Sequence, residues 1–135
     1  MPKKIKTRNE ERNSSAVYWK KAEEFHDTML SAQAAEKWNA VGLNAVHCVI
    51  SAGDALLVRA AGLRSAGVDH KDVLHLLSVH IKEAKPSGAL NHFDAVIRKK
   101  NLIEYEGREF VAKEAVEIVK HVERFYQWAK LQIKH

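Results

Sequence analysis

The most constraining feature of the sequence is a long segment, residues 36–61, that is apolar or small on nearly every side when drawn as a helix. A helix that is hydrophobic all round in a soluble protein is packed by neighbours on several flanks, so this segment predicts a central helix. It is interrupted by Asn39, Asn44, His47 and Asp54. Because no stretch reaches the ~18 apolar residues that a membrane span requires, we expect a soluble, cytoplasmic protein.

Four further segments carry apolar residues at helical spacing, and each predicts an amphipathic helix. They cover residues 15–30, 70–81, 90–105 and 111–133. No segment alternates apolar and polar residues for long enough to predict a strand, and six glycines and two prolines are too few for the many turns of an all-β sandwich. The predicted fold is an all-α, antiparallel up-and-down bundle of four main helices plus a short one.

The chain has 135 residues, which is room for one domain, and we place that domain at residues 14–135. Residues 1–13 show no periodicity and contain one apolar residue, Ile5, so they are predicted to form a disordered basic tail. In residues 1–12, five Lys and Arg stand against two Glu, which is +3 of the total net charge of +5. No apolar run follows this basic start, so we do not expect a signal peptide here.

Cysteine and histidine predict neither a metal site nor a catalytic site. Cys48 is the one cysteine, which excludes an intramolecular disulfide, and its apolar surroundings predict an inert core thiol. His70, His75 and His80 follow one another at intervals of five residues, whereas two ligands on one helix face are three or four residues apart. We therefore predict no metal, no cofactor and no catalytic residue.

The carboxylate of Asp54 falls within the apolar central segment. A carboxylate in such surroundings must find a partner or shift its pKa. We expect the face that carries Asp54 to reach solvent or the interface of a dimer.

The densest polar cluster lies at residues 98–105 and opens with three consecutive cations. Cations at a helix end favour anions, and nearby asparagine and tyrosine side chains add hydrogen bonding and stacking. The alternative is that the lysines only complement the helix dipole and solvate a surface. The candidate ligand-binding residues are Arg98, Lys99, Lys100, Asn101 and Tyr105, and the possible supporting polar residues are Asp54, His47 and Glu104.

Two stretches of the chain resemble the signatures of HEPN domains. Residues 44–57 are similar to the small-residue-rich helix of that family, and residues 98–105, followed by Gly107 and a long terminal helix, look like its second signature. HEPN domains are helical bundles that occur with nucleotidyltransferases, in toxin–antitoxin pairs and in antiviral systems. The resemblance covers residues 14–133 and implies a homodimer, which the long apolar helix also permits.

The chain departs from the ribonucleases of that family at one position. Those enzymes carry an Arg followed, after four to six residues, by a His and often by a Tyr two positions on. Here Arg98 and Tyr105 fit the outer positions, but Ile103 stands where the His would be, and isoleucine cannot exchange a proton. The resemblance therefore implies a non-catalytic module that binds RNA or a nucleotide through a basic groove.

Two other interpretations of the sequence stay open. The chain is an interaction partner of a small nucleotidyltransferase or a toxin–antitoxin component, with Tyr105 as a contact or a modification target. Alternatively it is an atypical, metal-independent ribonuclease that uses another base, such as His47 or Glu104.

Overall fold

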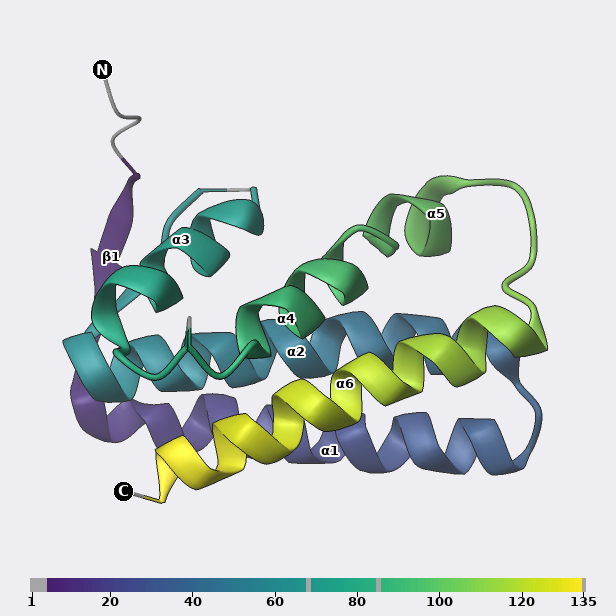
Figure 1. The fold of residues 1–135 in the computed structure, drawn as a ribbon, viewed down its shortest axis with the longest axis horizontal. Coiled ribbons are helices and arrows are strands. Elements are labelled where there is room, and N and C mark those ends of the chain that lie inside the picture. The colour runs from purple at the N-terminus through teal and green to yellow at the C-terminus, as the bar shows by residue number, and fades with distance from the viewer. Residues whose placement is uncertain (1–4, 68, 85, 135) are drawn as a thin grey trace.

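The computed structural model describes residues 5–67, 69–84 and 86–134, and it is a helical bundle built around one central helix. That helix is α2 (Trp38–Ala61), and α1 (Ser15–Ala34) lies antiparallel beside it. Helix α6 (Ala112–Ile133) crosses diagonally in front of them (Figure 1). Above α2 in the same view lie α3 (Lys71–His80), α4 (Ala89–Ile97) and α5 (Lys100–Tyr105). The prediction of an all-α, up-and-down bundle is confirmed.

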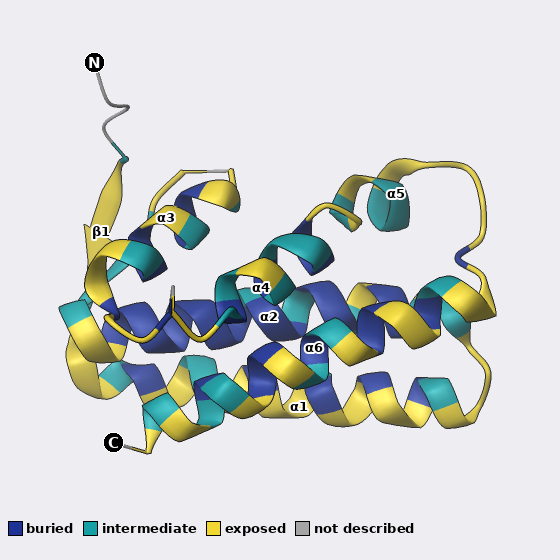
Figure 2. Cartoon of the chain, viewed as in Figure 1, coloured by how far each residue is buried: buried dark blue, intermediate teal, exposed yellow. Residues whose placement is uncertain are grey.

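The central helix is covered by its own chain. Residues 51–58 of α2 are buried without a break, and Figure 2 shows this helix as the most continuously buried element. The sequence predicts no segment that could span a membrane, but α2 is long and apolar enough to do so by length and composition. In the fold, 78% of its most apolar stretch is buried. Because one chain supplies this burial, the apolar length of α2 does not by itself indicate a dimer.

Two glycines of α2 mark the points where other helices approach it most closely. A Cβ atom on Gly53 would lie 3.2 Å from Cγ1 of Val73 in α3 and 3.3 Å from Cε2 of Phe93 in α4. A Cβ atom on Gly42 would lie 3.2 Å from Cδ1 of Ile103 in α5. All three distances are tighter than ordinary packing, so the missing side chains let α3, α4 and α5 rest directly on α2.

The helix boundaries differ from the prediction at three places. The helix predicted over residues 15–30 continues to Ala34. The central helix begins at Trp38, because Glu36 adopts the left-handed backbone conformation with φ 58° and ends the turn that follows α1. The segment predicted as one helix, residues 90–105, is divided into α4 and α5. At this division the N–H of Lys99 donates to the carbonyl of Val96, three residues earlier, whereas an α-helical N–H donates to the carbonyl four residues earlier. This hydrogen bond tightens the backbone between α4 and α5.

Residues 7–9 form a strand and residues 12–14 a 3₁₀ turn, although a disordered tail is predicted for residues 1–13. Strand β1 (Thr7–Asn9) pairs antiparallel with β2 (Leu63–Ser65), and a 3₁₀ turn (Arg12–Ser14) leads into α1. Residues 1–4 of the expected tail lie outside the described residues. Each strand has three residues, too few to show the alternation that predicts a strand, and the partners lie far apart in the sequence.

Aromatic side chains join α1 to α6. The ring of Tyr126 stacks on Trp19 at a centroid distance of 5.1 Å and on His26 at 4.0 Å. The imidazole of His26 also hydrogen-bonds the carboxylate of Glu123. These contacts hold α6 against α1, and burial raises the pKa of Tyr126 to about 12.

The close approach at Gly53 predicts that a branched side chain is not tolerated there. Gly53→Val places methyl groups against Val73 and Phe93, so we expect the free energy of unfolding to fall by about 1–3 kcal/mol. The matched control is Ala60→Val, at an exposed position of the same helix, which loses no more than about 0.7 kcal/mol of helix propensity. Chemical denaturation of both variants measures the difference, and equal losses would show that α3 and α4 do not pack closely on α2.

Candidate functional site

The predicted cationic cluster lies at the junction of α4 and α5, where the first turn of α3 faces it. A cavity of about 310 Å³ opens between these elements, and we call it the α3–α5 cavity. It is lined by Asp69, His70, Lys71, Ile97, Arg98, Lys100 and Asn101. Three of the five candidate ligand-binding residues, Arg98, Lys100 and Asn101, therefore lie together.

The other two candidates are placed differently. Lys99 lines a separate cavity of about 80 Å³ together with Glu114 and Glu117 of α6. Tyr105 ends α5 with 74% of its surface exposed, and its ring centroid lies 5.4 Å from Nζ of Lys100. The ring of Tyr105 is thus open to a partner beside the α3–α5 cavity, whereas Lys99 belongs to another part of the surface.

Both cations that α4 and α5 bring to the cavity already pair with a carboxylate. Nε of Arg98 donates to Oδ2 of Asp94 at 2.8 Å, and a guanidinium carries four further N–H donors. Nζ of Lys100 donates to Oε2 of Glu104 at 2.9 Å. This hydrogen bond is the main reason that the pKa of Lys100 is raised and the pKa of Glu104 is lowered. The pairs hold the cations in place and compete with any anionic ligand.

Two histidines from other helices come within electrostatic range of the Lys100–Glu104 pair. His70, at the start of α3, lines the cavity, and its pKa is lowered by burial and then by the charge of Lys100. His47 of α2 has its ring 5.4 Å from Phe25, and its charge lowers the pKa of Glu104. The sequence pattern indicates His47 as a supporting residue but does not place His70 here, because only the packing of α3 beside α4 brings His70 to the cavity.

Asp54 does not belong to the site, nor does it reach solvent or a dimer interface as expected. It is buried, and its Oδ2 accepts a hydrogen bond from Arg64 of β2 at 3.1 Å. Burial raises the pKa of Asp54, while the charge of Arg64 opposes that rise. Arg64 also donates to the hydroxyl of Tyr18, which donates to Glu10. This network ties β2 and the segment after β1 to α1 and α2.

Two residues weighed for chemistry are packing residues. Ile103, at the position of the family's His, rests on Gly42 of the central helix and belongs to the margin of the core. Cys48 is fully buried, as predicted, and burial raises the pKa of its thiol. Among residues 5–67, 69–84 and 86–134, no three His, Cys, Asp or Glu are grouped to hold a metal ion.

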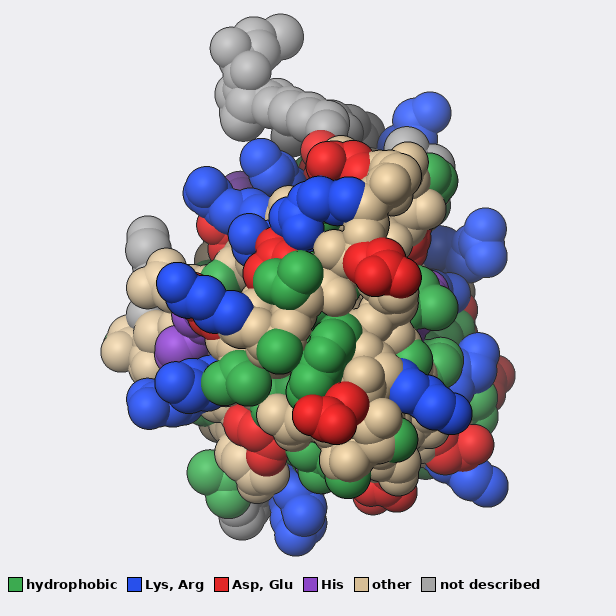
Figure 3. Space-filling view, turned by 90° about the vertical axis from the view of Figure 1, so that its right-hand side faces the viewer, with side chains coloured by type: hydrophobic (Ala, Val, Ile, Leu, Met, Phe, Trp, Pro, Cys, Tyr) green, Lys and Arg blue, Asp and Glu red, His purple; other side chains and the backbone are tan. Residues whose placement is uncertain are grey.

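Charge is mixed at the end of the bundle that carries the α1–α2 turn and the α5–α6 loop. Figure 3 shows lysines and arginines there dispersed among acidic and apolar side chains. This face differs from the α3–α5 cavity, where Lys71, Arg98 and Lys100 converge on one opening.

Comparison with known protein families gives no match for this chain, and comparison with curated proteins gives none either. We therefore infer a function from the geometry of the candidate site and from the motifs in the sequence.

A bidentate ion pair closes the loop that follows α5. Nη1 and Nη2 of Arg108 donate to the two carboxylate oxygens of Glu114 at 2.9 and 2.8 Å. The carboxylate also accepts the N–H of Val111, which precedes α6. The hydrogen bonds from Arg108 are the main cause of a pKa of about 2 for Glu114. This pair fixes the direction in which the chain leaves α5.

The lowered pKa of Glu114 predicts a stability contribution that acid removes. Above its ordinary pKa of 4.5 the contribution is complete, and it is lost as the pH falls through about 2. We expect Glu114→Gln to lower the free energy of unfolding by no more than about 1 kcal/mol at pH 7, because solvent screens the pair. The difference from the unmodified protein then shrinks between pH 4.5 and 2.

Denaturant titration at several pH values measures this effect, with Glu117→Gln on the exposed surface of the same helix as the control. A loss that is equally large at low pH would contradict an ionised Glu114 in the folded protein.

Proposed function

We propose that this chain is a non-catalytic helical module that binds RNA or a nucleotide at the α3–α5 cavity. The observation that carries the proposal is the convergence of Lys71 from α3 with Arg98 and Lys100 from the α4–α5 junction. Ammonium and guanidinium groups bind phosphate oxygens through charge-assisted hydrogen bonds, and Arg98 keeps donors beyond the one used for Asp94. A phosphate in the cavity would meet cations from two separate segments.

Next to the phosphate site, Tyr105 and Asn101 offer groups suited to a base. The exposed ring of Tyr105 presents a face on which a base can stack, and Lys100 beside it favours the adjoining phosphate. The exposed amide of Asn101 both donates and accepts hydrogen bonds, as the polar edge of a base requires. The ring of Tyr105 and the amide of Asn101 together favour a nucleotide, and not an isolated anion, as the ligand.

Binding RNA through this site predicts opposite effects for a cation and for the carboxylate that competes for it. We expect Arg98→Ala to weaken the binding of labelled single-stranded RNA by about tenfold, because a hydrogen bond to a charged group contributes about 1.5 kcal/mol or more. Asp94→Asn is expected to tighten it severalfold, because Arg98 is released from its intrachain partner. Fluorescence anisotropy at two salt concentrations measures both effects, and the affinity should fall with added salt.

The matched control for that experiment is Arg59→Ala, an exposed arginine of α2 outside the α3–α5 cavity. Equal weakening by Arg98→Ala and Arg59→Ala would mean that RNA responds to net charge only, and the cavity would lose its role.

The stacking face of Tyr105 leads to a separate expectation. Tyr105→Ala removes the platform for one base and should weaken RNA binding by about 1–3 kcal/mol. Because the side chain is 74% exposed, the midpoint of thermal unfolding should stay unchanged. A variant that binds RNA normally, or that mainly unfolds, would remove Tyr105 from the site.

One observation favours ribonuclease activity as a second candidate function. His70 lines the cavity together with Arg98, and burial lowers its pKa, which favours the neutral imidazole that can accept a proton. Acid–base cleavage also needs a proton donor, and among the described residues that line the cavity His70 is the one imidazole. Binding is therefore the better supported function. RNA cleavage that His70→Ala abolishes would reverse this order.

The proposal includes a homodimer, which the resemblance to HEPN domains implies. The described chain covers α2 by itself, so the support for a dimer is the resemblance and not the apolar central helix. Light scattering of the purified protein measures its mass in solution directly.

A further inference from the structure

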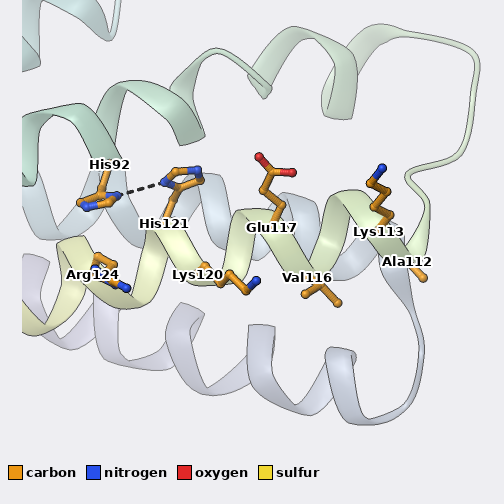
Figure 4. Close-up of a pocket in the computed structure, with 8 residues that line it drawn as sticks. All are labelled: His92, Ala112, Lys113, Val116, Glu117, Lys120, His121 and Arg124. Atoms are coloured by element: carbon orange, nitrogen blue, oxygen red, sulfur yellow. Dashed lines mark hydrogen bonds between the residues drawn. The ribbon is translucent and has the colours of Figure 1, made fainter.

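A second cationic groove runs along α6 and shares no lining residue with the α3–α5 cavity. It has a volume of about 660 Å³, and we call it the α6 groove. Figure 4 shows His92 of α4 beside His121 of α6, with further charged side chains of α6 following in a row. The groove therefore lies where α4 packs on α6.

The charged residues of the α6 groove are mostly positive. Lys113, Lys120 and Arg124 stand against Glu117, which gives three cations and one carboxylate, or +2 with neutral histidines. The three cations are seven and four residues apart, so they follow one face of the helix over roughly 16 Å. Such a row attracts an anion and offers it several donors.

The two histidines form a hydrogen-bonded pair that holds one proton between the rings. Nδ1 of His92 and Nδ1 of His121 are 3.0 Å apart, so one ring donates and the other accepts. In the neutral pair, the accepting ring carries its proton on Nε2, while Nε2 of the donating ring has none. One added proton, placed on that bare Nε2, gives both rings an outer N–H donor and leaves the hydrogen bond between them intact.

The charged groups around the His92–His121 pair couple its protonation to the binding of an anion. Burial is the main cause that lowers the pKa of His92, followed by His121 and Arg124. The other charged groups along the groove, Lys113, Glu117 and Lys120, also come from α6, and α4 contributes His92 itself. An anion beside Arg124 would offset the charge that opposes protonation, so anion and proton favour each other.

We propose that the α6 groove binds the phosphate group of a small ligand through Arg124, Lys120 and the His92–His121 pair, with uptake of one proton. The doubly charged tetrahedral group accepts hydrogen bonds from the guanidinium, the ammonium and the two outer imidazole N–H groups. The site is independent of the RNA-binding proposal, because no residue is common to the two.

Sulfate is the first probe, since it has the same shape as phosphate and keeps two charges from pH 6 to pH 8. Histidine ring signals are followed by ¹H–¹⁵N NMR during a sulfate titration, with chloride at equal ionic strength as the reference. We expect saturable shifts of His92 and His121, and binding about tenfold tighter at pH 6 than at pH 8. Absence of saturable shifts, or an affinity that does not change with pH, would overturn the proposal.

Two pairs of variants separate the site from general charge. Arg124→Gln should weaken sulfate binding about tenfold, whereas Arg59→Gln, also at an exposed arginine, should not change it. His121→Asn should remove the pH dependence, whereas His75→Asn, at an exposed histidine of α3, should keep it. Circular dichroism checks that each variant is folded. Equal effects of Arg124→Gln and Arg59→Gln on sulfate affinity, or of His121→Asn and His75→Asn on its pH dependence, would overturn the proposal.

Inorganic phosphate and glycerol 3-phosphate, compared at pH 6, then distinguish the two sources of such a group. Tighter binding of the ester indicates a phosphorylated small molecule, and equal or tighter binding of the inorganic ion indicates free phosphate. Failure of both to displace sulfate would overturn the assignment to phosphate.

Discussion

Burial of most of the apolar helix α2 by the other helices is the constraint on which the rest of the fold depends. Each neighbouring helix must cover a different flank of α2, and the absent side chains at Gly42 and Gly53 set how close three of them come. Helices α3 and α4 pack against Gly53, and α5 packs against Gly42. This packing places the first turn of α3 beside the α4–α5 junction, so the α3–α5 cavity is a consequence of how the core packs.

The charged residues of the structure are used in two ways. Asp54 and Arg64 form a shielded pair that joins strand β2 to the central helix, where breaking one partner leaves a buried charge. Arg98–Asp94 and Lys100–Glu104 are pairs within single helical segments; Arg98 is exposed to solvent, whereas both side chains of the Lys100–Glu104 pair are partly buried. At the proposed binding site, these pairs hold the cations in position and would compete with a phosphate.

The sequence predicts what depends on local periodicity. The apolar character of α2 on every side predicts its central place, and the buried Cys48 follows from the same pattern. The stripes of the other segments predict the remaining helices to within a few residues, except where the backbone tightens at Lys99. These features can be predicted because they depend on residues that are close together in the sequence.

What the sequence does not predict depends on residues that are distant along the chain. Strand β1 is ordered by β2, more than fifty residues away, and neither has enough residues to show a pattern. His70 reaches the cavity because α3 packs beside α4, and Lys99 turns toward α6 instead of joining Arg98. The direction of a side chain at a helix junction follows from tertiary packing, which spacing alone does not encode.

An NMR map of where single-stranded RNA contacts the folded protein tests binding at the α3–α5 cavity most directly. We expect backbone amide shifts to gather at His70, Lys71 and residues 98–105, with the interior network around Asp54 and Arg64 unchanged. Shifts confined to other surfaces, or no shifts at an RNA concentration that saturates anisotropy, would contradict a binding site at the α3–α5 cavity.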